Sequence, residues 1–157
     1  MVYIHFVGSS SLLCSTFFMT TNYVKIGITG SRSITNTRWI CNILHKHMLE
    51  YPDSVICLIV GDADGVDAIA YNYAQQSLQF AIQLKPAHKY IPLLYKHLGR
   101  WGNKLYHARN MQVVDNCDEL IALWDGKSAG TRQTKDYADK IGRDYTVYIY
   151  NERTKGM

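Results

Sequence analysis

The 157-residue sequence lacks several features that mark common protein classes. Its four cysteines form no C-x-x-C pair, which argues against a disulfide framework or a zinc site. No apolar run reaches the ~18 residues of a membrane span. No lysine or arginine precedes the apolar N-terminal part, as it would in a signal peptide. We therefore expect a protein of the reducing cytoplasm, with no metal site and no membrane partner.

Acidic residues are also scarce, and one window has none. The net charge of +4 is modest and does not by itself indicate nucleic acid. Between Ala68 and Val114, however, there is no Asp or Glu, and the window holds six Lys or Arg and three His. Its central connection, 85–104, exceeds the ~2–6 residues typical of an α/β unit. It could be a solvated basic surface, or a lid or wall for an anionic ligand.

Strand-like and helix-like patterns alternate along the chain. We predict strands at 24–29, 55–60, 80–84, 119–123 and 145–150, and helices at 35–50, 66–76, 105–116 and 131–141. Three of the strands are continuously apolar, which favours a parallel sheet covered on both faces. The prediction is α/β: a single Rossmann-like, doubly wound domain with a mainly parallel five-stranded sheet. We expect this domain at 23–151, after an N-terminal extension (1–22, with Met19 as an alternative start) and before a tail (152–157).

Glycine-containing turns follow three of the predicted strands. They read "GSRS" from Gly30, "GDADGVD" from Gly61 and "WDGKSAGT" from Trp124. None is a G-x-G-x-x-G or P-loop motif. Each leads towards a helix, whose N-terminus favours anions, and ligands of open parallel sheets bind at the carboxyl ends of the strands. Any one of these could be a simple turn, but three at one edge favour a nucleotide-like ligand.

The second turn contains three carboxylates. A glycine at position four and a tyrosine at position twelve exclude an EF-hand. Asp64 could cap the next helix, and Asp67 could favour its dipole or accept hydrogen bonds from ligand hydroxyls. A Mg²⁺ contact is a further alternative. Arg109, in "HARNM", could bind a phosphate, or form a surface salt bridge with Asp115 or Asp118.

Four motifs in this order resemble a known family. "GITGSR", "GDADGVD", "ARNMQVV" and "DELIALWDGKSAGT" together are similar to the YspA / cpYpsA-related branch of the SLOG superfamily, over residues 24 to about 150. The resemblance implies a Rossmann-like fold that binds a nucleotide or nucleotide-derived ligand, and often a homo-oligomer. The superfamily also includes the lonely-guy phosphoribohydrolases and the DNA-processing protein DprA.

The comparison with the phosphoribohydrolases separates binding from hydrolysis. Gly130 and Thr131 match the G-T of their P-G-G-x-G-T-x-x-E turn, and Arg109 matches their active-site arginine. Their catalytic glutamate falls on Thr134, which cannot act as a carboxylate acid or base. The resemblance therefore implies phosphate binding and does not imply the family's hydrolysis.

Three hypotheses follow. The first is a sensor or sequestering module for a nucleotide or ADP-ribose-like ligand, held by backbone N–H groups of the turns, with Trp124 beside the base or in the core. Its site comprises Gly30, Ser31, Arg32, Gly61, Asp62, Gly65, Asp67, Arg109, Asn110, Trp124, Asp125, Ser128, Gly130 and Thr131. The second is an N-glycosidase-like enzyme, with catalytic candidates Asp62, Asp67, Asp125 and Arg109. The third is a single-stranded DNA-binding protein that uses the basic segment.

Overall fold

The structure is a computed structural model that describes residues 22–77, 80–85 and 100–151; at 85 and 100–104 it describes the backbone only. The proposed extension, the tail and most of the basic connection lie outside these residues. The domain bounds therefore stay a prediction, as does a lid or wall for the ligand.

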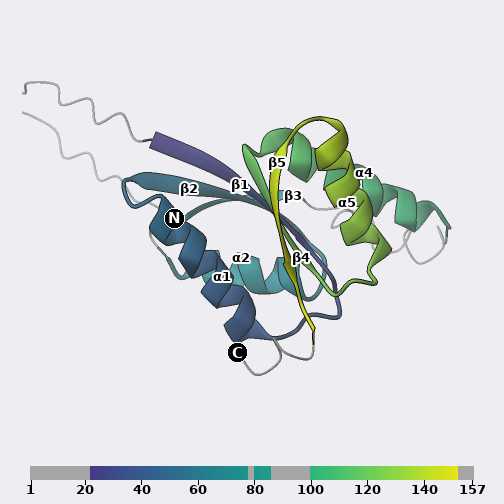
Figure 1. The fold of residues 1–157 in the computed structure, drawn as a ribbon, viewed down its shortest axis with the longest axis horizontal. Coiled ribbons are helices and arrows are strands. Elements are labelled where there is room, and N and C mark those ends of the chain that lie inside the picture. Colours follow the sequence, from purple (N-terminus) through teal and green to yellow (C-terminus); the bar gives the residue numbers. More distant parts are fainter. Residues whose placement is uncertain (1–21, 78–79, 86–99, 152–157) are drawn as a thin grey trace, which may run out of the picture.

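A parallel sheet forms the centre of the molecule (Figure 1). Its strands are β1 (Asn22–Gly30), β2 (Ser54–Gly61), β3 (Phe80–Lys85), β4 (Glu119–Trp124) and β5 (Asp144–Ile149). They lie in the order β3-β2-β1-β4-β5, and each adjacent pair is parallel. In register, Ile26 of β1 lies opposite Leu58 of β2 on one side and Glu119 of β4 on the other. The predicted fold class is confirmed.

Four described helices cover the two faces of the sheet (Figure 1). They are α1 (Thr37–Glu50), α2 (Val66–Gln75), α4 (Arg100–Asn116) and α5 (Ala129–Lys140). Helices α1 and α2 contact each other on one face, and α4 and α5 do so on the other. Each lies where its pattern predicted it, but α4 begins five residues before the predicted Leu105. None of the described helices has the length and apolarity needed to cross a bilayer.

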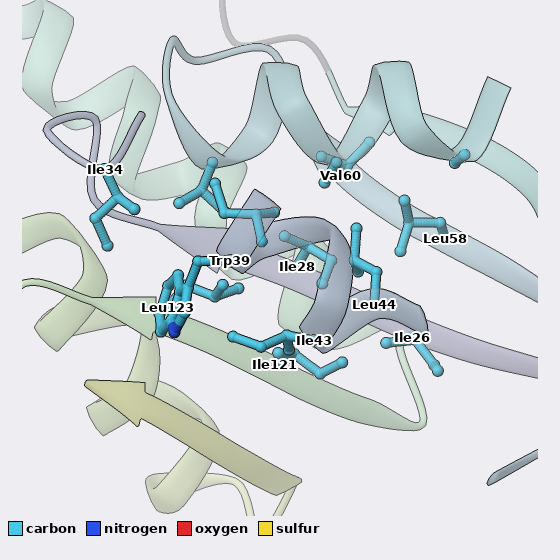
Figure 2. Close-up of a cluster of buried hydrophobic side chains, with 14 of the residues drawn as sticks. Ile26, Ile28, Ile34, Trp39, Ile43, Leu44, Leu58, Val60, Ile121 and Leu123 are labelled. Carbon is cyan, nitrogen blue, oxygen red and sulfur yellow. The ribbon is translucent and has the colours of Figure 1, made fainter. Parts of the chain in front are cut away.

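The main core lies between the sheet and α1 and α2 (Figure 2). Ile26 and Ile28 of β1 point to this face and pack with Trp39 and Leu44 of α1. The intervening Gly27 faces α4, where an added Cβ would come within 2.8 Å of Cys117 Sγ. Side chains of a strand alternate between the two faces of the sheet. The isoleucines of β1 therefore fill the core under α1 and α2, and Gly27 lets α4 pack closely on the opposite face.

The strand order reverses direction at β1. From β1 the chain continues through β2 and β3 to one edge, and β4 and β5 lie on the other side of β1. In such doubly wound sheets the crevice at the carboxyl ends of the two strands flanking this switch point is the usual ligand site. Here those strands are β1 and β4, which end at Gly30 and Trp124.

Candidate functional site

A cavity of about 510 Å³ lies at this switch point. Its volume is within the range of small-molecule sites. It brings together predicted site residues from all three turns and from α4: Gly30, Arg32, Asp67, Arg109, Asn110, Asp125, Ser128, Gly130 and Thr131. Turns that are almost 100 residues apart in the chain therefore share one cavity, as the parallel sheet predicts.

The other predicted site residues lie near the cavity without lining it. Ser31 is fully buried; its N–H donates to the Leu123 carbonyl at 3.0 Å, and its Oγ accepts from the Asp125 N–H at 3.1 Å. Its N–H is thus already used to bind the turn after β1 to strand β4. Trp124 donates its indole N–H to the Ser128 carbonyl at 3.0 Å, which braces the third turn.

The glycines of the first two turns are explained by packing within the protein. A Cβ on Gly30 would lie 2.5 Å from the Val66 side chain, and one on Gly61 would lie 1.3 Å from Arg109 Nη1. Gly65 has φ +77° and sits against the backbone of Arg32. Gly130 differs, because the nearest atom to its added Cβ is Asn110 Nδ2 at 3.9 Å.

Arg109 reaches the cavity from α4 and is 5% exposed. Its Nη1 donates to Asp67 Oδ2 at 3.1 Å and to Asp62 Oδ1 at 3.3 Å. The alternative of a surface salt bridge with Asp115 or Asp118 is therefore wrong, because this side chain is buried and pairs with Asp62 and Asp67. Its Nε is buried and has no hydrogen-bond partner among the described residues.

Asp67 is the buried partner in this group. Burial raises the pKa of Asp67 to about 6, although the Arg109 charge and the Ala63 N–H act in the opposite direction. It lies in the first turn of α2, as predicted. The predicted cap is wrong: α2 is preceded by Gly65 with no side-chain cap, and Asp64 is exposed.

Asp62 and Asp67 are thus both bound to a cation of the protein itself. Among the described residues, no group of three or more His, Cys, Asp and Glu side chains is arranged to hold a metal ion. The Mg²⁺ contact considered for this turn stays an untested alternative.

Asp125 organises the third turn. Its Oδ1 accepts from the N–H groups of Ser128 at 2.7 Å and Lys127 at 2.9 Å, and its Oδ2 accepts from Ser33 Oγ at 2.6 Å. Burial opposes ionisation, but these hydrogen bonds outweigh it and lower the pKa of Asp125 below its usual value. The carboxylate is ionised and fixed at the entrance to α5.

The first turn of α5 presents backbone donors to the cavity. Ser128 caps the helix, and its Oγ accepts from the Thr131 N–H at 3.4 Å. The N–H groups of Ala129 and Gly130 have no acceptor among the described residues, and both residues line the cavity. Thr134 is buried and donates to the Gly130 carbonyl at 2.8 Å, so it offers no acid or base at the family's glutamate position.

Several cavity residues were missed by the sequence reasoning: Thr29, Ser33, Ala63, Tyr106, His107, Ala129 and Gln133. Tyr106 is the most informative of them. The Arg32 guanidinium lies over its ring, 4.2 Å from the centroid. Tyr106 precedes Arg109 and Asn110 by three and four residues, which places all three on one face of α4. That spacing was visible in the sequence.

No protein-family model and no curated protein matches the chain. DNA processing protein A (DprA) from Streptococcus pneumoniae matches with a TM-score of 0.64 and 18% identity, over 83% of this chain and 52% of that one. DprA from Helicobacter pylori matches with a TM-score of 0.57 and 18% identity, over 82% of this chain and 66% of that one.

The chain shares its fold with DprA. The chain spans about half of the pneumococcal structure and about two thirds of the H. pylori structure, and 18% identity limits the likeness to the fold. Because DprA is a member of the superfamily that the motifs resemble, the match supports a SLOG-like fold. The YspA-related branch remains a prediction from the motifs.

Proposed function

We propose that this protein binds a nucleotide or nucleotide-derived ligand in the cavity between β1 and β4, and that it belongs to the YspA-related branch of the SLOG superfamily. The ligand's phosphate would lie at the N-terminus of α5. It would accept hydrogen bonds from the free N–H groups of Ala129 and Gly130 and would be attracted by the positive end of the helix dipole.

The observation that carries this proposal is the open position of Gly130. Glycine in a helix costs up to ~1 kcal/mol relative to alanine, and here neither packing nor a positive φ requires it. The other glycines of the predicted site are needed by the protein itself. A glycine that the fold does not need, beside free backbone donors in a cavity, fits a ligand that approaches the backbone closely.

Isothermal titration with AMP, NAD, ADP-ribose and cyclic nucleotides tests the proposal. We expect at least one to bind, and Gly130→Ala to weaken that binding about ten-fold or more by placing a methyl group in the phosphate's path. Asp139→Ala is the matched control, because it changes an exposed residue on the same helix, remote from the cavity. If none of these compounds bound, or if Gly130→Ala bound as well as the control, the proposal would fail.

Single-stranded DNA binding is the second candidate function. Its support is the H. pylori match, because that protein binds single-stranded DNA. A nucleic-acid strand would use the same phosphate position and, in addition, the basic segment of this chain. Titration of a fluorescent oligo-dT at increasing salt tests it: this function predicts binding that weakens steeply with salt, and the absence of binding at low salt would exclude it.

The hydrolase hypothesis has less support from the geometry. Asp62 and Asp67 are each paired with Arg109, and Asp125 accepts hydrogen bonds from the third turn. Arg109 is bound to two of them. Release of free base from a nucleotide, lost in an Asp67→Asn variant that still folds, would be the result that favours an enzyme.

A further inference from the structure

The charges around the cavity define which phosphate it can hold, if the proposed function is correct. The charged side chains that line it, among the described residues, are Arg32, Arg109, Asp67 and Asp125. The two cations are thus matched by two carboxylates. His107 also lines the cavity, and the exposed Lys127 and Arg132 near the start of α5 do not.

The buried arginine has little charge left for a ligand. Its Nη1 lies 3.1 Å from Asp67 and 3.3 Å from Asp62, so two carboxylates already neutralise one guanidinium. Its Nε is buried and has no acceptor among the described residues. Arg109 therefore lines the site without supplying net positive charge.

The helix N-terminus is partly neutralised as well. The Asp125 carboxylate lies 2.7 Å from the N–H of Ser128, the residue just before the free donors of Ala129 and Gly130. It already occupies part of the positive end of the α5 dipole. A ligand anion would share that end with it, and each further negative charge on the ligand would be repelled by the same carboxylate.

Neutral donors supply the rest of the phosphate contacts. They are the N–H groups of Ala129 and Gly130 and the side-chain amide of Asn110, which lines the cavity next to Gly130. Arg32, which lies over the Tyr106 ring and has no carboxylate partner among the described residues, is the remaining cation. Two cations face two lining carboxylates, and Asp62 beside Arg109 adds a third, so these described side chains leave no surplus positive charge for a second negative charge on a ligand.

We infer that the cavity selects a phosphodiester, which carries one negative charge, over a phosphomonoester, a diphosphate or a triphosphate. A cyclic nucleotide and an internal phosphate of a DNA strand both have this chemistry. The inference rests on the proposed function and specifies the ligand class of the same site.

A matched pair of ligands isolates the charge. Adenosine 5′-methyl phosphate differs from AMP by one methyl group, which removes the second ionisation of the phosphate. At pH 7.5 we expect it to bind about five-fold more tightly than AMP, and ATP to bind more weakly than both. The second pKa of a phosphate monoester is about 6, so at pH 5.5 most AMP carries one negative charge on its phosphate, as the methyl ester does. The affinity of AMP is therefore expected to approach that of the methyl ester at this pH.

Asp125→Asn locates the effect in the protein. Asparagine retains a side-chain acceptor for the turn but removes the charge, so AMP is expected to gain about five-fold relative to its methyl ester. Thermal unfolding of the variant checks that it folds, and the pH series on the wild-type protein does not depend on it. The dissociation constants of cyclic AMP and of a dT trinucleotide are then compared. Tighter binding of cyclic AMP indicates a small ligand, and tighter binding of the trinucleotide indicates a DNA strand.

The outcomes separate this inference from the proposed function. If AMP or ATP bound as tightly as the methyl ester at pH 7.5, the charge selection would be wrong and nucleotide binding would stand. If the ratio of affinities were unchanged in Asp125→Asn, the assignment to this carboxylate would be overturned. If no phosphate compound bound to the wild-type protein, both would fail.

Discussion

The second and third turns occupy equivalent places in the fold and each contain two glycines, but their environments differ. "GDADGVD" and "WDGKSAGT" both follow a buried strand, both lead into a helix, and both contain two glycines; the first has three aspartates and the second has one. The second turn is filled by the protein, because Arg109 occupies the space beside Gly61 and binds Asp62 and Asp67. The third turn is open at Gly130. A glycine-rich turn at the carboxyl end of a strand can thus be filled by an internal arginine or stay open to a cavity.

Removal of Arg109 is expected to have the largest effect on the second turn. Arg109→Met would leave the buried Asp67 without its cation, which typically costs ~3–5 kcal/mol in the free energy of unfolding. Urea denaturation at pH 7.5 measures this. The double variant Arg109→Met/Asp67→Asn is the control, and we expect it to recover part of the loss. A single variant as stable as wild type would contradict the structural role of the pair.

The pH dependence of stability tests the same pair without removing the arginine. Because the folded-state pKa of Asp67 is raised to about 6 from 3.8, the folded state binds the proton more tightly than the unfolded state does. The protonated Asp67 therefore adds ~1–3 kcal/mol to the free energy of unfolding below about pH 4, and this contribution is lost as the pH rises through 6. We expect the wild-type stability minus that of Asp67→Asn to fall over this interval, and a flat difference would contradict the raised pKa.

Gly61→Ala is expected to have a smaller but clear effect. The added Cβ would overlap Arg109 Nη1, and that guanidinium is held in place by two carboxylates. Overpacking of this kind costs ~1–3 kcal/mol. Thermal unfolding measures the loss. Combination with Arg109→Met, which removes the clashing group, is expected to make the alanine much less harmful; equal effects in both backgrounds would mean that the clash is not the cause.

The sequence predicted the strands, helices and turns that form the site better than the side-chain contacts within it. Apolar runs that end at Gly30 and Gly61 determine strands, and the periodicity of the segments between them determines helices, so the convergence of three turns follows from a parallel sheet. The partners of Arg109 could not be predicted, because the carboxylates of Asp62 and Asp67 are brought to it by tertiary structure. The different roles of Gly61 and Gly130 could not be predicted either, because they depend on the atoms that the fold places beside each glycine.

Gly130→Ala is the counterpart of Gly61→Ala in the third turn and is expected to have the smallest effect on stability, with the opposite sign. No described atom lies closer than 3.9 Å to the new Cβ, and alanine is the better helix former. The free energy of unfolding is therefore expected to rise by a few tenths of a kcal/mol, up to about 1 kcal/mol. Thermal unfolding of the two alanine variants, measured side by side without ligand, decides the comparison. If Gly130→Ala were destabilising like Gly61→Ala, the glycine would serve the fold, and the main observation for a ligand at the start of α5 would be lost.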